Sequence, residues 1–254
     1  MAEVDKDGGS AAAAGGGGKA PTVKSIFVYP IKSCRGISVS QALLCSTGFV
    51  WDRQWVVVNS KGRGCTQRVE PKLALIQVEL PIEAFSQGWV PKNTSYLVVR
   101  APGMAELMVP LTKPSLQSDG VSVWEWSGTA LDEGDKAAKC IFVDGCEPFA
   151  EDLWKQIKIN ELTFQGVMLC PRCKVPTINQ EDAMQGSEPT ETMMKFRSAK
   201  ALEVNATKTK YKGRVYLGQM LVCEDKDSSW RKVINVGDII HVEKILPSYA
   251  DVAV

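Results

Sequence analysis

The sequence has one histidine, no long apolar run and almost no net charge. Because His241 has no second imidazole beside it, a zinc site that needs further soft ligands is not expected. No apolar run approaches the roughly 20 residues that a membrane-spanning helix needs, so we expect no transmembrane segment. The 30 Lys and Arg against 29 Asp and Glu leave a formal charge of +1. Sequence-independent nucleic-acid binding needs a uniform positive field, so no nucleic-acid partner is expected.

The amino-terminal segment, residues 1–20, is a low-complexity stretch rich in Gly and Ala, which we predict to be a disordered tail. It carries three acidic residues and no arginine, unlike a transit peptide, so a cytoplasmic location is expected. A chain of 254 residues is too large to need disulfides for stability. In a reducing compartment the cysteines are therefore predicted to be free thiols: Cys34, Cys45, Cys65, Cys140, Cys146, Cys170, Cys173 and Cys223.

Short apolar runs separated by Gly and Pro predict a mainly β fold with some α, a barrel or a sandwich. In the first half, strands are predicted at residues 23–31, 36–45, 53–60, 73–80, 96–100, 105–111 and 121–126. In the second half, helices are predicted at 151–157 and 188–201 and strands at 140–145, 162–169, 214–223 and 238–246. His241 is interpreted as an ordinary strand residue, and Met193 and Met194 as residues that pack on a helix face. Trp124 and Trp126 are interpreted as barrel core or rim.

The junction between the halves is abrupt. Residues 128–139 start like a helix, with the acidic cluster Asp132, Glu133 and Asp135 early and lysines late, an order that suits the helix dipole. At Cys140 the sequence changes directly into a strand pattern. Barely two helical turns remain, too few for a stable helix. This indicates that a segment is missing there.

The sharpest local motif is Cys170-Pro171-Arg172-Cys173, at the end of an apolar strand. Four interpretations stay open. The pair could be half of a zinc site, although further soft ligands are lacking. It could be a redox dithiol, although the prolines and β-branched residues that follow disfavour the helix such a pair needs. One thiolate could ligate a soft metal whose other ligands come from a cofactor, beside the cations Arg172 and Lys174. Both could be ordinary surface thiols.

A second constellation lies far away in the sequence. Lys32, Ser33, Arg35 and Gly36 place cations, a hydroxyl and a flexible glycine on a loop between two predicted strands, which is the chemistry of a phosphate cradle. Arg53 stands between Trp51 and Trp55 and follows an aspartate. An arginine held by an acid and an aromatic face is preorganised to bind an anion.

Taken together, these motifs resemble the MOSC domain family, in which a MOSC N-terminal β-barrel domain precedes a MOSC domain. The similarity is to the plant-type mitochondrial amidoxime-reducing component group. It rests on eight segments in order: VYPIKSCRGISV, GFVWDRQWVVV, TQRVEPKLALI, FVDGCEPFAEDLW, VMLCPRCKVPTI, EPTETMMKFR, YLGQML and INVGDIIHV. The resemblance implies a first β-barrel domain at residues 21–139 and a MOSC domain lacking its N-terminal part at residues 140–254.

The resemblance also implies a function and a site. It implies a molybdenum cofactor (a molybdenum pyranopterin) with Cys173 as catalytic thiolate ligand of the metal. Lys32, Ser33 and Arg53 would bind the pterin and its phosphate, and Pro171 and Arg172 would line the same pocket. The implied activity is reduction of N-hydroxylated or N-oxygenated compounds with electrons from cytochrome b5 and its NADH-dependent reductase. Family resemblance also allows a mitochondrial location.

This chain departs from the family pattern at Lys139 and Cys140. Family members carry further strands and helices there and a Phe-Arg-Pro-Asn motif before the strand at 140–145. We interpret the difference as an internal deletion, which is expected to impair cofactor binding. Two other functions stay open: a cofactor-handling domain related to molybdenum cofactor sulfurase, with no pyridoxal phosphate expected on this chain, and a non-catalytic β-barrel binding protein.

Overall fold

The computed structural model describes residues 20–45, 48–112, 120–123, 126–129, 140–204, 213–224 and 232–253. In the first half the strands are β1 (Thr22–Val28), β2 (Ile37–Val39), β3 (Gln41–Cys45), β4 (Gly48–Phe49), β5 (Gln77–Glu79), β6 (Tyr96–Arg100), β7 (Leu107–Pro110), β8 (Gly120–Val123) and β9 (Trp126–Thr129). The second half contributes β10 (Cys140–Asp144), β11 (Trp154–Ile159), β12 (Leu162–Pro171), helix α1 (Thr190–Arg197), β13 (Tyr216–Cys223), β14 (Lys232–Asn235) and β15 (Ile240–Ile245). The predicted mainly β class with some α is confirmed.

Strand β1 ties the beginning of the chain to its later segments. It pairs antiparallel with β10 on one side, where Phe27 lies opposite Cys140, and with β2 on the other. A turn near the end of the chain adds two backbone hydrogen bonds: Val23 N donates to Asp238 O at 2.9 Å, and Gly237 N donates to Val23 O at 2.8 Å. The two ends of the chain therefore fold against each other.

The main apolar core is shared by these distant segments. Strand β14 pairs with β3, and β11, β12 and β15 belong to a four-stranded sheet with the order β13-β12-β11-β15. The buried side chains that meet between them include Val23, Ile26, Ile157, Phe164 and Ile234. The domain boundary at residues 139 and 140 stays a prediction, and strands from both sides of it are paired.

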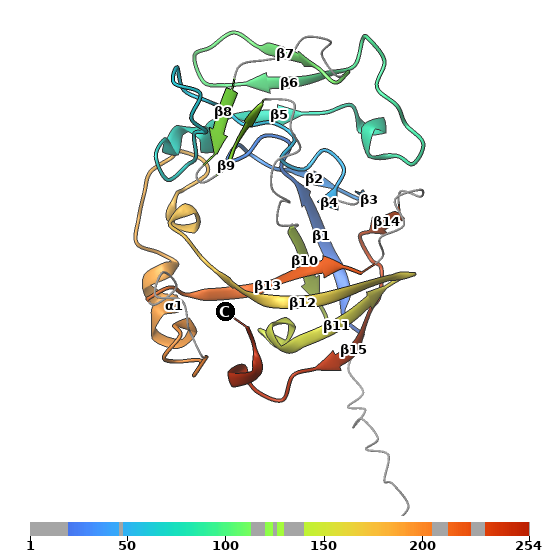
Figure 1. Cartoon of the computed structure of the whole chain (residues 1–254), viewed down its shortest axis with the longest axis vertical. Coiled ribbons are helices and arrows are strands. Elements are labelled where there is room, and N and C mark those ends of the chain that lie inside the picture. Colours follow the sequence, from blue (N-terminus) through green and yellow to red (C-terminus); the bar gives the residue numbers. More distant parts are fainter. Residues whose placement is uncertain are drawn as a thin grey trace, which may run out of the picture.

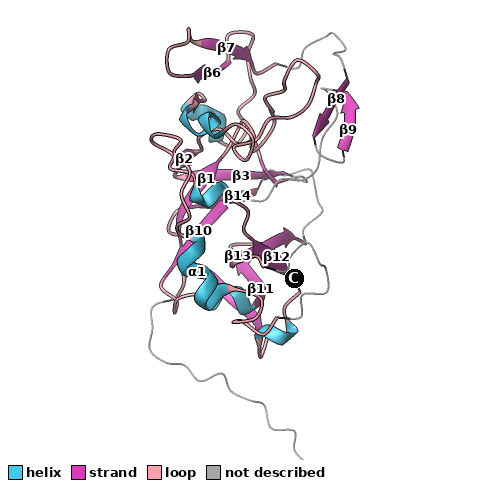
Figure 2. Ribbon diagram, turned by 90° about the vertical axis from the view of Figure 1, so that its left-hand side faces the viewer, coloured by secondary structure: helices cyan, strands magenta, loops and turns pink. Residues whose placement is uncertain are grey.

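A second apolar cluster supports the sheet β5-β6-β7, which lies at the opposite end of the molecule from β11 and β15 (Figures 1 and 2). Its buried members are Ile31, Cys34, Leu73, Val78, Leu97 and Leu111. Ile31 and Cys34 belong to the loop between β1 and β2, so this cluster anchors the loop that carries Lys32 and Ser33.

Three of the secondary-structure predictions are wrong. Residues 53–60 form isolated bridges, Ile31 to Trp55 and Val58 to Gly64, because the positive φ angles of Trp51 (70°) and Arg53 (51°) turn the chain before a strand can form. The predicted strand at 73–80 begins as a 3₁₀ turn, Pro71–Leu75, and becomes extended only at β5. The predicted helix at 151–157 is a short 3₁₀ turn, Ala150–Leu153, followed by β11.

Other predictions fare better. The helix predicted at 188–201 is found as the shorter α1, with Met193 and Met194 on it and Met194 37% exposed. His241 lies on β15, as predicted. The pattern at 121–126 divides into the hairpin β8–β9. The tail at 1–19, the junction segment at 130–139 with its acidic cluster, and Trp124 lie outside the described residues. No helix among the described residues combines the length and apolar character that a membrane crossing requires.

Cys34 allows a test of the second cluster. Its side chain is 1% exposed, and burial raises the pKa of its thiol from 9.0 to about 12. The folded protein therefore holds this proton more tightly than the unfolded chain does. Stability contributed by the protonated thiol is complete below about pH 9 and declines as the pH rises toward about 12. We expect the urea midpoint to fall more steeply above about pH 9 in the wild type than in Cys34→Ala. Cys45→Ala, at an exposed thiol, should retain the wild-type slope, and equal slopes in all three proteins would contradict the burial argument.

Candidate functional site

Backbone hydrogen bonds hold the two predicted anion-binding loops side by side. Arg53 N donates to Tyr29 O at 2.7 Å, Lys32 N donates to Trp55 O at 2.8 Å and Trp55 N donates to Pro30 O at 3.1 Å. Ile31 and Trp55 form a parallel bridge between the same loops. The structure thus brings the loop of Lys32 and Ser33 next to the loop of Arg53, although about twenty residues separate them in the sequence.

Both loops contain strained backbone. Ser33 has a φ of 67° and Arg53 a φ of 51°, which places two residues with side chains in the left-handed region. Such conformations persist where surrounding contacts enforce them, and they are frequent at binding sites. Here the enforcing contacts include Gln67, whose Nε2 donates to Ser33 O at 2.8 Å, and the buried Asp52, whose Oδ1 accepts from Tyr29 N at 2.8 Å.

The Arg53 guanidinium is fixed by an acid and by an aromatic ring. Its Nη1 donates to Asp52 Oδ2, and its carbon lies 5.0 Å from the centre of the Tyr29 ring. Burial lowers the pKa of Arg53, but the Asp52 carboxylate and a hydrogen bond with the Cys140 thiol more than compensate, so the pKa is raised. The aromatic partner differs from the predicted one: Trp51 and Trp55 stack on each other at 6.1 Å, and Tyr29 takes their place.

The Cys170-Pro171-Arg172-Cys173 segment ends β12 and continues into a short turn. Arg172 N donates to Val215 O at 2.8 Å, and Arg172 Nε donates to Leu217 O at 2.9 Å, so both its backbone and its side chain hold the segment to β13. Cys170, Pro171, Arg172 and Cys173 are all half-buried. Cys173 is followed by the 3₁₀ turn Val175–Thr177 rather than by an α-helix, as the prolines predicted.

This geometry bears on the open interpretations of the cysteine pair. Burial raises the pKa of Cys170 and outweighs the opposite effect of Arg172, so the environment of this thiol does not activate it as a nucleophile. Within the described ranges, no group of three His, Cys, Asp or Glu side chains is arranged to hold a metal ion. A single thiolate whose metal is completed by an external chelator is chemically consistent with the half-buried Cys173.

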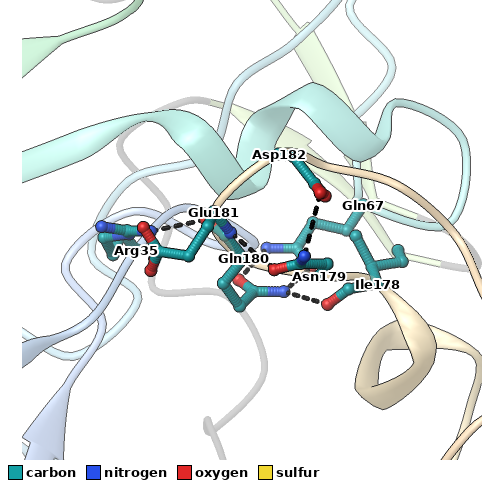
Figure 3. A network of polar contacts seen from close by, with 7 residues as sticks. All are labelled: Arg35, Gln67, Ile178, Asn179, Gln180, Glu181 and Asp182. Atoms are coloured by element: carbon teal, nitrogen blue, oxygen red, sulfur yellow. Dashed lines mark hydrogen bonds and ion pairs between the residues drawn. The ribbon is translucent and has the colours of Figure 1, made fainter.

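Side chains from the two halves of the chain form one polar network beside these loops (Figure 3). Arg35 Nη2 donates to Gln180 O at 2.5 Å and to Glu181 Oε1 at 2.7 Å. The Gln67 and Gln180 amides exchange hydrogen bonds at 3.2 Å, while Gln67 also binds Ser33 O. The loop that carries Lys32 and Ser33 is therefore tied directly to the loop that follows Cys173.

Tyr29 lies where the two halves meet. Burial raises the pKa of its hydroxyl most, Cys140 and Asp52 raise it further, and both Arg53 and Arg172 lower it. Both guanidinium groups therefore lower the pKa of one phenol, although one comes from the loop after β4 and the other from the residue after β12. Sequence reasoning missed Tyr29 and Cys140. The pairing of β10 with β1, which no local motif encodes, brings Cys140 to this place.

Two family models match the chain: the MOSC N-terminal beta barrel domain over residues 20–144 and the MOSC domain over residues 132–241. Human mitochondrial amidoxime-reducing component 1 is 27% identical over 290 residues, covering 87% of this chain and 82% of that protein. Rat mitochondrial amidoxime reducing component 2 is 24% identical over 256 residues, covering 69% and 72%. Molybdenum cofactor sulfurase from Arabidopsis thaliana is 24% identical over 300 residues, covering 86% of this chain and 35% of that protein.

The alignment with the human relative runs over 290 residues, although this chain has 254. Residues of that relative consequently face gaps in this chain, as a missing internal segment would require. The internal deletion at Lys139 and Cys140 stays a prediction.

Gly36 offers a test of the site's geometry. A Cβ on Gly36 would lie 2.7 Å from Cε1 of Tyr29, so Gly36→Ala must displace the ring that lies against Arg53. We expect a loss of about 1–3 kcal/mol in the free energy of unfolding, measured by urea titration. The matched control is Gly186→Ala, whose Cβ would approach no atom closer than 3.8 Å and which should change stability by less than about 0.5 kcal/mol. Equal effects of the two substitutions would refute the close approach of Tyr29.

Proposed function

The chain carries a MOSC N-terminal β-barrel domain and a MOSC domain, and from this we propose that it is a molybdenum-cofactor oxidoreductase that reduces N-hydroxylated or N-oxygenated compounds. The names of the human and rat relatives state amidoxime reduction, which is reduction of this substrate class. By the same resemblance, the electrons come from cytochrome b5 and its NADH-dependent reductase. The relatives' names also favour a mitochondrial location over the cytoplasmic one expected from the composition of residues 1–20.

The observation that carries this proposal is the hydrogen-bonded network in which Gln67 and Arg35 tie the Lys32–Ser33 loop to Gln180, on the loop that follows Cys173. An anionic chelator needs cations and oriented donors around it, while a soft metal needs a thiolate at its edge. The residues present fit this requirement. Cys173 is half-buried rather than enclosed, follows Arg172 directly and lies on a segment held to the Lys32 loop through Arg35 and Gln180.

In the proposed site, Cys173 gives its thiolate to molybdenum, Lys32, Ser33 and Arg53 bind the pterin and its phosphate, and Pro171 and Arg172 line the pocket beside the metal. When bound, the cofactor supplies a metal that exchanges electrons and an oxygen atom with the substrate. The protein's own contribution is to orient its donors. Arg53 presents a guanidinium already fixed by Asp52 and Tyr29, and Arg172 is fixed by its bond to Leu217 O.

A second candidate is a cofactor-handling domain related to molybdenum cofactor sulfurase. The similarity to the plant sulfurase favours it, because it covers 86% of this chain but only 35% of the sulfurase. This function would use the same cofactor-binding residues for delivery of sulfur to the metal, with no pyridoxal phosphate on this chain.

The third candidate is a non-catalytic binding protein, which would use these residues without the Cys173 thiolate.

Metal content separates a metal ligand from a neighbouring thiol. The purified wild type should contain molybdenum and pterin below one equivalent, since the predicted internal deletion would weaken the cofactor-binding loops. Cys173→Ser should lose the metal, because an alcohol is a poor ligand for a soft metal. Cys170→Ser is the matched control and should retain the wild-type amount. Molybdenum is measured by mass spectrometry, and equal content in the two variants would overturn the role of Cys173.

Activity separates the candidate functions. With cytochrome b5, its reductase and NADH added, we expect the molybdenum-loaded wild type to reduce benzamidoxime to benzamidine, measured by chromatography. Cys173→Ser should be inactive and Cys170→Ser active. Transfer of sulfur to the cofactor without amidoxime reduction would favour the sulfurase-like function. Binding of pterin without either reaction would favour the binding protein.

A further inference from the structure

A buried group of charged and polar side chains lies behind the cysteine segment, outside the proposed site. Arg197, at the end of α1, is 2% exposed, and its partner Asp152 is fully buried. The Arg197 Nη2 donates to Asp152 Oδ2, while Nη1 donates to the Tyr249 hydroxyl at 3.2 Å. That hydroxyl donates in turn to Asp152 Oδ2 at 3.1 Å. The Phe149 ring lies 4.4 Å from the guanidinium carbon, so the group is enclosed on all these sides.

A third donor of Arg197 reaches the strand that holds the cysteine segment. Its Nε donates to Tyr216 O at 2.9 Å. The carbonyls on either side of Tyr216 belong to Val215 and Leu217, and both accept hydrogen bonds from Arg172. Three consecutive carbonyls are thus bound by two arginines, one of which immediately precedes Cys173. Tyr216 is also the register partner of Pro171.

The carboxyl-terminal segment completes this support. Leu169 N, one residue before Cys170, donates to Ala253 O at 3.0 Å. Leu169, Tyr216 and Val252 are buried in one apolar cluster, with Tyr249 packed against it. Both the hydroxyl that binds Arg197 and the carbonyl that binds Leu169 therefore come from the last residues of the chain.

A purely stabilising role does not explain this arrangement well. Burying an ion pair costs desolvation free energy, and well-packed apolar side chains of similar size are often as stabilising. What a guanidinium adds is geometry, because its planar donors fix several acceptors at defined angles. The acceptors here are Asp152, Tyr249 and the Tyr216 carbonyl, which lies beside both bonds of Arg172.

We infer that Arg197, held by Asp152 and Tyr249, is a positioning residue that fixes the direction in which the Cys173 thiol is presented to its ligand. This rests on the proposed role of Cys173 as the metal thiolate. Arg197 acts through Tyr216 and the two hydrogen bonds of Arg172 on either side.

The first test uses the protein without added cofactor and reads the thiols directly. In Tyr249→Phe only the hydroxyl is lost, and in Arg197→Lys the charge is kept but the fork of donors is lost. We expect both variants to raise the rate of iodoacetamide labelling at Cys173 several-fold relative to the exposed Cys45, measured on peptides by mass spectrometry. Ile240→Val, which shortens a buried side chain on β15, is the control for general loosening and should leave the ratio unchanged.

The second test uses the molybdenum-loaded protein. The electron paramagnetic resonance signal of the reduced metal should shift in Tyr249→Phe and remain unchanged in Ile240→Val, because the signal depends on the direction of the thiolate. An unchanged labelling ratio in Tyr249→Phe, with native circular dichroism, overturns the positioning role even if Arg197→Lys does not fold. If the wild type takes up no molybdenum, the proposed function fails, and the labelling ratio still decides the role of Arg197.

Discussion

The backbone pairing of β1 with segments from the far end of the chain is the constraint on which the candidate site depends. Phe27 opposite Cys140, and Val23 bonded to the turn at Gly237 and Asp238, fix the amino-terminal strand within the later sheets. The loop that follows β1 carries Lys32, and so its position relative to β12 is set by these bonds. The strand pairing brings this loop close to the segment that follows β12, and the hydrogen bond from Arg35 to Gln180 then joins the two.

The sequence predicts the fold well where the local pattern and the tertiary environment agree. Strands β6, β7, β12, β13 and β15 are apolar runs bounded by turn residues, and they form where expected. The pattern fails at residues 151–157, where charged residues suggest a helix. Trp154 and Ile157 are buried there by packing against β12 and β15, and this long-range burial outweighs local propensity.

The chemistry of the site is predicted in part for the same reason. Cations, a hydroxyl and a thiol can be recognised by residue type, so Lys32, Ser33, Arg53 and Cys173 can be proposed as site residues from their motifs. Tyr29 and Cys140 escape detection, because their importance comes from which strands pair. The buried Asp152 and Arg197 escape as well, since two charged residues 45 positions apart give no sign of contact in the sequence.

The arginines around the candidate site can contribute in two ways, through net positive charge and through hydrogen-bond donors of fixed orientation. Asp52 balances Arg53 and Glu181 pairs with Arg35, so these arginines contribute oriented donors more than net positive field. A multiply charged phosphate is bound through short, charge-assisted hydrogen bonds, for which fixed orientation matters as much as charge. Arg172 meets both needs, because its Nε is committed to Leu217 O while its Nη2 passes Gly218, where an added Cβ would lie 3.4 Å away. Gly218 has a φ of 72° and no side chain, so it leaves space for the Arg172 guanidinium beside the strand. The proposed anion site would therefore depend on the backbone shape of β13 as directly as on the cations themselves.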